Sequence, residues 1–127
     1  MQWGEMDEYG HVNNAVFFRY FESARIEYLT RIGFIDSFDE AGVGAILHST
    51  SCRFRSPLRF PQTVRVGVRV VSLDDDRFTH QYVVFDETDA VVAEGTGVVV
   101  SFDYRNGRKI SLPAGVAERI RELGVAQ

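Results

Sequence analysis

Residues 14–32 read NAVFFRYFESARIEYLTRI, and their apolar side chains recur every three or four positions: Phe17, Phe21, Ala24, Tyr28 and Ile32. This period predicts one long helix with an apolar stripe along its length. The first half of the segment is apolar on nearly every side, so we expect the rest of the fold to wrap around it. Gly33 follows directly, at the place where a residue in the left-handed conformation commonly ends a helix.

The pattern after the helix changes to that of a β-sheet. We expect residues 36–44, rich in Ser, Asp, Glu and Gly, to form a linker. Period-two alternation and valine-rich runs then predict strands over residues 45–54, 64–70, 78–84 and 90–102. Turns at 73–77 and 87–89 join the last three strands as an antiparallel meander. Asn106-Gly107 predicts one more tight turn, and residues 113–123 predict a short helix closed by Gly124.

Length and composition are those of an ordinary globular protein. The chain has 127 residues, 45% hydrophobic and 25% charged, which predicts a single domain over residues 1–127. No apolar run is long enough to span a membrane and no leader is visible, so we expect a cytoplasmic protein without membrane contact. The net charge of −4 argues against binding to nucleic acid, although all but one of the basic residues are arginines, which suit phosphate groups. Cys52 is the single cysteine, and we expect a buried structural side chain.

These elements predict an α+β fold with about five antiparallel strands curled around one helix. Long valine-rich sheet edges are usually paired or shielded. We therefore expect a homodimer that shares a continuous sheet, and a further pairing of dimers into a tetramer is left open.

Residues 7–15, DEYGHVNNA, collect polar groups immediately before the helix. A purely structural interpretation is available, because Asn13 or Asn14 would cap the helix, Gly10 would permit a turn and Asp7 would cap a loop. The alternative is a functional site. The residues by themselves leave both interpretations open.

Residues 3–25, WGEMDEYGHVNNAVFFRYFESAR, resemble the opening of the hotdog-fold thioesterases of the 4-hydroxybenzoyl-CoA thioesterase and acyl-CoA thioester hydrolase type. Residues 55–70, RSPLRFPQTVRVGVRV, and 91–113, VVAEGTGVVVSFDYRNGRKISLP, resemble strands of the same family more loosely. The HVNN run is also similar to one in acyl-carrier-protein thioesterases. The resemblance implies a hotdog fold and hydrolysis of an acyl-CoA thioester to a carboxylic acid and free coenzyme A, with no cofactor and no metal. The family's first strand would be short here, since only Met1 to Glu5 precede the motif.

The resemblance places the catalytic carboxylate at Asp7 and brings the peptide N–H of Asn14 to the thioester carbonyl. Physical chemistry supports the second assignment, because the first N–H groups of a helix lack internal partners and the helix dipole favours negative charge there. Asp7 would act as nucleophile or as general base, and the sequence does not choose. His11 matches the histidine of the carrier-protein thioesterases and would orient Asp7, hold a water or protonate the thiolate. Tyr9 stands where that second family has an asparagine.

Other residues are candidates for binding the substrate. We expect Asn13 and Phe17 to contact it, with the acyl group in a pocket lined by helix aromatics and by the partner subunit. Two basic groups are candidates for the phosphates of coenzyme A: Arg55 with Ser56, and Arg105, Arg108 and Lys109 around the Asn106-Gly107 turn. The GTG run at 95–97 lacks the context of a phosphate loop and predicts a bulge or a close approach to the helix. His48 and His80 lack metal-ligand spacing.

Two other functions remain open at this stage. A noncatalytic hotdog domain would bind acyl-CoA as a sensor or carrier. A hotdog dehydratase would act on hydroxyacyl thioesters, with His11 and an acid flanking the substrate.

Overall fold

The computed structural model describes residues 14–56 and 63–126. Its elements follow one another as α1 (Asn14–Arg31), α2 (Phe34–Ala41), β1 (Val43–Phe54), β2 (Arg65–Leu73), β3 (Arg77–Phe85), β4 (Val91–Asp103), β5 (Arg108–Lys109) and α3 (Ala114–Leu123). The predicted long helix and the four predicted strands are confirmed to within a few residues. None of the described helices is both long and apolar enough to cross a membrane.

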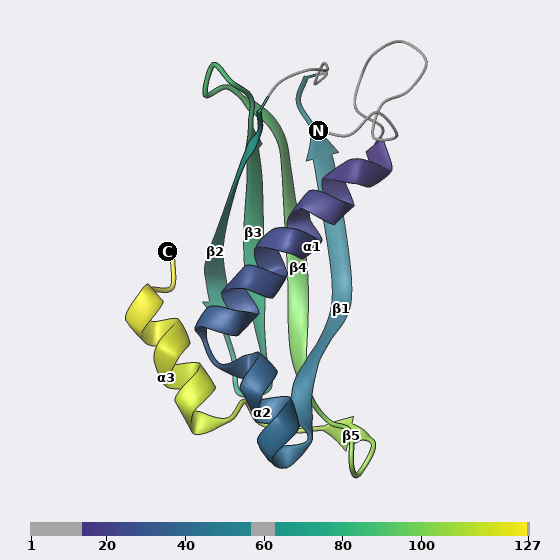
Figure 1. Ribbon diagram of the computed structural model, residues 1–127, viewed down its shortest axis with the longest axis vertical. Helices are drawn as coiled ribbons and strands as arrows, with labels where there is room; N and C mark the ends of the chain where they lie inside the picture. The colour runs from purple at the N-terminus through teal and green to yellow at the C-terminus, as the bar shows by residue number, and fades with distance from the viewer. Residues whose placement is uncertain (1–13, 57–62, 127) are drawn as a thin grey trace.

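The five strands form one antiparallel sheet in the order β1-β4-β3-β2, with the short β5 paired to the end of β4. Figure 1 shows α1 lying diagonally across one face of this sheet, with α2 and α3 at its lower end. This arrangement confirms the α+β class, the β2-β3-β4 meander and the hotdog fold. Within the described residues, β1 has a strand on one side only, so its outer edge is free.

The expected linker at 36–44 is wrong, because the chain forms α2 there. Gly33 and Gly42 flank this helix, both in the left-handed conformation with φ of 76° and 72°. Phe34 is buried, while Ile35 and Phe38 occupy the spacing of an amphipathic turn. Asp36, Asp39 and Glu40 are exposed, and these polar residues concealed the helical period in the sequence.

The contact between α1 and β4 determines how closely α1 packs against the sheet. The ring of Phe21 is fully buried and stacks on Tyr82 of β3, with ring centroids 4.8 Å apart and planes inclined by 13°. Gly95 lies beneath that ring, and a Cβ there would collide with Phe21 and with the backbone oxygen of Ser51. The predicted close approach of the GTG run to the helix is therefore confirmed.

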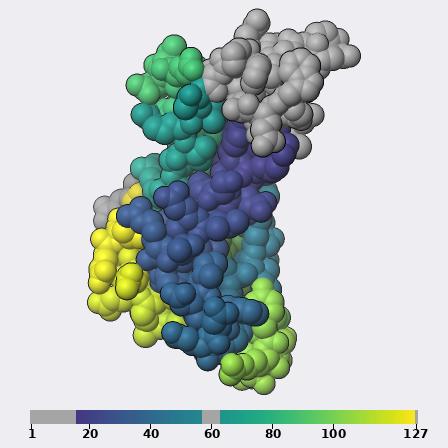
Figure 2. Space-filling view, viewed as in Figure 1, coloured from purple at the N-terminus to yellow at the C-terminus, as the bar shows by residue number. Residues whose placement is uncertain are grey.

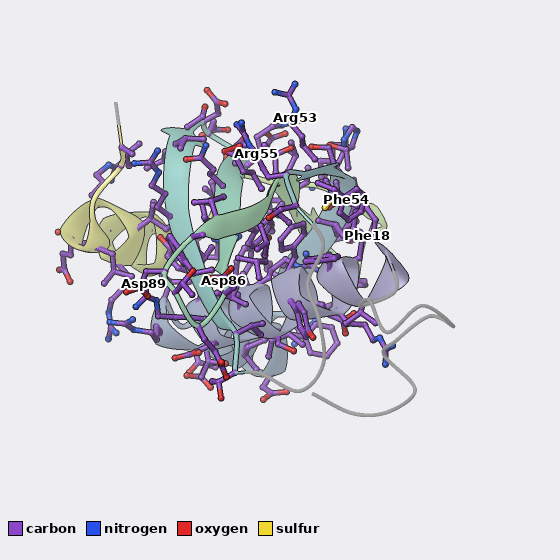
Figure 3. The ribbon with its side chains drawn as sticks, turned by 90° about the horizontal axis from the view of Figure 1, so that it is seen from above. Phe18, Arg53, Phe54, Arg55, Asp86 and Asp89 are labelled. Carbon is purple, nitrogen blue, oxygen red and sulfur yellow. The ribbon has the colours of Figure 1, made fainter. Side chains whose placement is uncertain are left out.

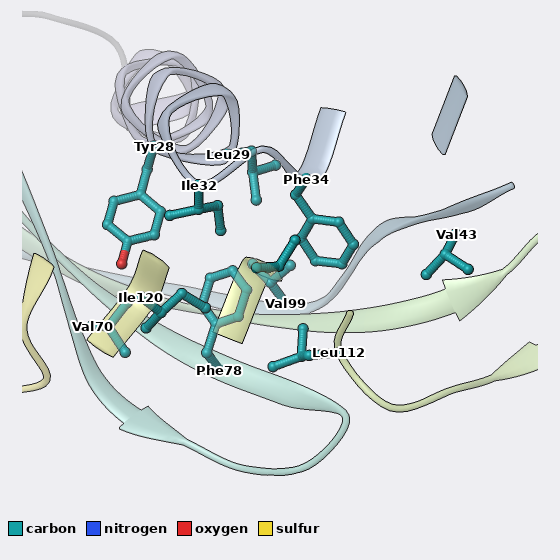
Figure 4. Packing of buried hydrophobic residues seen from close by; sticks show 11 residues of the cluster. Tyr28, Leu29, Ile32, Phe34, Val43, Val70, Phe78, Val99, Leu112 and Ile120 are labelled. Carbon is teal, nitrogen blue, oxygen red and sulfur yellow. The ribbon is translucent and has the colours of Figure 1, made fainter. Parts of the chain in front are cut away.

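Two groups of buried side chains lie between α1 and the sheet. The upper group joins Phe17 and Phe21 to Tyr82, Val84 and Val92. The lower group, drawn in Figure 4, brings together side chains from α1, α2, α3 and the sheet: Tyr28, Leu29, Ile32, Phe34, Val70, Phe78, Val99 and Ile120. The C-terminal helix thus closes the lower end of the core.

A buried polar group joins the two halves of the core. His80 is fully buried, and its Nδ1 lies 3.0 Å from the hydroxyl of Tyr82, which also accepts a bond from Arg25 at 3.4 Å. Burial, aided by the charge of Arg25, lowers the pKa of His80 to about 4. Burial raises the pKa of Tyr28, whose ring packs against His80 edge-on, to about 12. Both groups are therefore neutral at pH 7.

We predict that Gly95→Ala destabilises the fold by roughly 1–3 kcal/mol, because the added methyl group displaces Phe21 or β1. Thermal unfolding measures the loss. Gly115→Ala is the matched control, since nothing lies within 4 Å of a Cβ at that helical position. Equal melting temperatures for the two variants would contradict the close packing of α1 on β4.

The lowered pKa of His80 predicts a loss of stability in mild acid. The unfolded state takes up a proton near pH 6.5 and the folded state only near pH 4, so this contribution is present above pH 6.5 and lost as the pH falls towards 4. The loss amounts to roughly 3 kcal/mol. Denaturant unfolding at a series of pH values should show a shallower decline for His80→Gln than for the wild type. The exposed His48 provides the control, as His48→Gln should leave the wild-type slope intact.

Candidate active site at the start of the long helix

The start of α1 provides the electropositive feature of the site. The first N–H groups of a helix have no intrahelical partner, and here the first turn carries no acidic side chain that would neutralise them. Asp7, His11 and Asn13 lie outside the described residues. Asn14 is the first residue of α1, as the sequence predicted, so its peptide N–H belongs to this electropositive end.

Aromatic side chains surround this end of α1. Phe17 is buried and contacts Phe54 at the end of β1, with ring centroids 5.2 Å apart in an edge-on arrangement. Phe18 and Phe54 are 40% and 43% exposed, and Figure 3 shows both beside α1. The structure therefore places Phe17 in the core and leaves Phe18 and Phe54 as the apolar surface next to the helix start. Sequence reasoning missed Phe54, which sits at a strand end without a distinctive pattern.

Arg55 and Ser56 follow Phe54, and their backbone N–H groups both donate to the carbonyl of Val92, at 2.8 and 3.2 Å. The side chain of Arg55 forms an ion pair and a hydrogen bond with Glu94. In Figure 3 the side chains of Arg53 and Arg55 lie on the side of the sheet away from α1. Arg55 therefore follows Phe54, which contacts α1, but its charge is offset by Glu94 and its side chain faces the other side of the sheet.

The second basic group lies elsewhere. Arg108 and Lys109 form β5, at the opposite end of β4 from the α1 start, as Figure 1 shows. The hydrogen bond from Arg77, with a smaller contribution from Lys109, lowers the pKa of Asp76. The hydrogen bond from Asn106, with a smaller contribution from Arg108, lowers the pKa of Asp103, so acids partly offset this cluster too. Arg105 lies in the turn of the same hairpin, with its side chain against Gly42. One protomer does not bring this hairpin to the start of α1.

The remaining candidate nucleophiles and ligands are poorly suited to chemistry at this site. Cys52 is half-buried on β1, and desolvation raises the pKa of its thiol, which keeps it protonated. His80 is sealed beneath α1, and His48 is exposed on β1. Within residues 14–56 and 63–126, no three His, Cys, Asp or Glu side chains cluster as metal ligands would.

Comparison with known proteins decides the family. The model of the thioesterase-like superfamily matches residues 1–120. The chain belongs to this superfamily. A curated protein of Aquifex aeolicus, provisionally named an esterase, is 31% identical over 123 residues, which cover 96% of this chain and 94% of that protein. An acyl-acyl carrier protein thioesterase of Arabidopsis thaliana chloroplasts is 26% identical, over 91% of this chain and 61% of its own.

Solved structures agree with this membership of the thioesterase-like superfamily. A thioesterase of Thermus thermophilus, crystallised with coenzyme A and zinc, is 32% identical with a TM-score of 0.83, covering 98% of this chain and 89% of that one. A DHNA-CoA thioesterase of Staphylococcus aureus has a TM-score of 0.85 at 17% identity over 97% and 85% of the two chains, which shows a shared fold. The resemblance seen in the sequence is thus confirmed, and the chain is a thioester hydrolase.

Proposed function

We propose that this protein hydrolyses acyl-CoA thioesters to a carboxylic acid and free coenzyme A at the start of α1. The observation that carries the proposal is the acid-free first turn of α1 beside the exposed rings of Phe18 and Phe54. Such an end stabilises the oxyanion that forms when the carbonyl carbon is attacked, while the rings provide an apolar surface for the acyl group. The coenzyme A bound to the Thermus thermophilus relative supports the choice of thioester.

In this proposal Asp7 either attacks the carbonyl carbon itself or activates the water that attacks it. In one route its carboxylate bonds to the carbonyl carbon, the C–S bond breaks, and the thiolate leaves and takes up a proton; water then hydrolyses the mixed anhydride. In the other route Asp7 takes a proton from a water that attacks the carbonyl carbon, the C–S bond then breaks, and the thiolate leaves and takes up a proton. Asn14 donates its peptide N–H to the carbonyl oxygen in both, and His11 steadies the water or protonates the thiolate.

The active form is a homodimer joined through β1. The outer edge of β1 is unpaired in the described chain, and its residues 47–51 are all exposed. Free N–H and C=O groups along such an edge pair readily with a second strand. Phosphate binding by Arg55 with Ser56, and by Arg105, Arg108 and Lys109, stays a prediction. The second group would reach the α1 start only from another subunit.

Family membership favours hydrolysis over the noncatalytic and dehydratase alternatives. A dehydratase would need His11 and an acid on either side of the substrate, so the product decides between dehydration and hydrolysis. Release of thiol from an acyl-CoA panel, with no enoyl product, separates the three functions.

We predict that Asp7→Asn lowers kcat by a factor of roughly 100 or more, as loss of a positioned base or nucleophile does. The substitution removes the charge and keeps the shape, so the melting temperature should change little. Thiol release measured with a colorimetric reagent tests it, and Asp74→Asn, an exposed acid in the β2-β3 turn, is the control. Wild-type turnover in Asp7→Asn would refute the assignment.

A single turnover in heavy-oxygen water distinguishes the two routes. Label recovered in Asp7 would establish direct attack by the carboxylate, because anhydride hydrolysis leaves one solvent oxygen on one of the two carboxyl groups. Label confined to the released acid is the result for an activated water and also for an anhydride cleaved at its acyl carbon, so only label in Asp7 decides between the routes.

A further inference from the structure

A pocket lies between the C-terminal half of α1, the strand β2 and the end of α3. Its volume is about 440 Å³, which is typical of ligand pockets. Apolar side chains of β2, among them Val66 and Val68, form one wall, and Leu123 with Gly124 closes one end. Figure 2 shows α3 and the C-terminal residues, in yellow, beside the lower part of α1.

The C-terminal residues hold this end of the pocket in place. The peptide N–H of Ala126 donates to the carbonyl of Val70 at 2.7 Å, and Val125 forms an isolated β-bridge with the same residue. These contacts attach the chain after α3 to the edge of β2. The pocket therefore has walls that are fixed by α1, by β2 and by the chain after α3.

The hydroxyl of Tyr28 is the buried polar group of this pocket. Tyr28 is 7% exposed, and its hydroxyl has no hydrogen-bond partner among the described residues. Figure 4 shows this hydroxyl pointing from α1 towards Val70, which also lines the pocket. Burial raises the pKa of Tyr28 to about 12, so the hydroxyl keeps its proton at pH 7 and can donate. Because buried polar groups normally have a partner, this hydroxyl points to a ligand with a hydrogen-bond acceptor.

Two arginines give the pocket an excess of positive charge. Arg31 follows Tyr28 by one turn of α1, close enough for its charge to oppose the rise in the Tyr28 pKa. Glu27 is the one acid among the described lining residues, and neither it nor Arg31 takes part in the ion pairs of residues 14–56 and 63–126. Arg69 donates its Nε–H to Gln81 at 2.7 Å and keeps its charge. An uncompensated guanidinium thus lies beside an unpaired hydroxyl.

The carbonyl groups at the end of α1 would repel an anion if they were free, but hydrogen bonds engage them. The carbonyl of Thr30 accepts from the peptide N–H of Gly33 at 3.2 Å. The carbonyl of Arg31 accepts from Nη1 of Arg119 at 3.3 Å, which brings a further guanidinium to this end of the helix. These bonds weaken the negative end of the helix dipole, so the charged side chains decide which ligand is favoured.

A carboxylate suits both donors, because its two oxygens can accept from a hydroxyl and from a guanidinium at once. We propose that this pocket binds a carboxylic acid with an apolar chain of medium length, whose carboxylate is held by the Tyr28 hydroxyl and Arg31 and whose chain lies along Val66 and Val68. Tyr28 is fourteen residues along α1 from Asn14, about 21 Å at the rise of an α-helix. The site is therefore separate from the candidate active site and does not depend on hydrolysis there.

Calorimetric titration with octanoate at pH 7 tests the two donors. The wild type should bind octanoate at least about tenfold more tightly than octanamide, which has the same length and no charge. Tyr28→Phe and Arg31→Gln should each weaken octanoate binding about tenfold. Arg53→Gln is the matched control, because Arg53 is an exposed arginine of β1 outside the pocket. Equal octanoate affinity in the wild type and all three variants would place the acid elsewhere and overturn the proposal.

Thermal unfolding separates a lost contact from a damaged fold. Tyr28→Phe keeps the ring and removes only a hydroxyl that has no partner in the described part of the chain, so without ligand it should melt no lower than the wild type. Saturating octanoate should raise the melting temperature of the wild type and of Arg53→Gln, and raise that of Tyr28→Phe less. The same increase in the wild type and Tyr28→Phe would contradict the role of the hydroxyl.

Chain length and coenzyme A distinguish this pocket from the candidate active site. Acetate should bind at least about tenfold more weakly than octanoate, because it lacks the apolar chain. Saturating coenzyme A, which the proposed function places at the start of α1, should leave the octanoate affinity within about twofold of its value in the absence of coenzyme A. Competition between the two would mean a shared site and overturn the proposal. If no acyl-CoA is hydrolysed but octanoate binding still requires Tyr28 and Arg31, the proposed function fails and this site stands.

Discussion

The close contact between α1 and β4 is the constraint on which the rest of the structure depends. Gly95 lets the Phe21 ring lie against the sheet and stack on Tyr82, and the Arg25–Tyr82–His80 contacts hold the next turn of the helix. These contacts fix both the distance of α1 from the sheet and its position along its own axis. Its first turn is therefore presented beside Phe54 at the upper end of β1, where an electropositive end can meet a substrate.

In the proposed site, backbone groups and side chains have different roles. Peptide N–H groups need no specific side chain to stabilise an oxyanion, so α1 can be apolar on its first turns and still contribute to catalysis. Phe18 and Phe54, which are 40% and 43% exposed, provide an apolar surface beside these dipoles. The proposed attacking group, Asp7, precedes the helix in the sequence.

Much of the fold could be predicted because its strongest periods are local. The stripe from Phe17 to Ile32 and the alternation from Val64 to Val70 predict their elements without tertiary information. The GTG run predicted either a bulge or a close approach to the helix, and the structure shows the close approach at Gly95. The α2 helix was missed because eight residues with three acids carry too little apolar signal against two glycines. The side to which Arg55 points was beyond prediction as well, since it depends on the register of β1 with β4 and on Glu94. The burial of His80 follows from packing against Tyr28 and Phe78, which are distant in sequence.

The central claim of the proposed function is that the thioester carbonyl sits at the first turn of α1. A crystal structure with a non-hydrolysable acyl-CoA thioether or ketone analogue tests this most directly. The account predicts the carbonyl oxygen within hydrogen-bond distance of the peptide N–H of Asn14 and the acyl carbons beside Phe18 and Phe54. An analogue bound away from the start of α1 would contradict it.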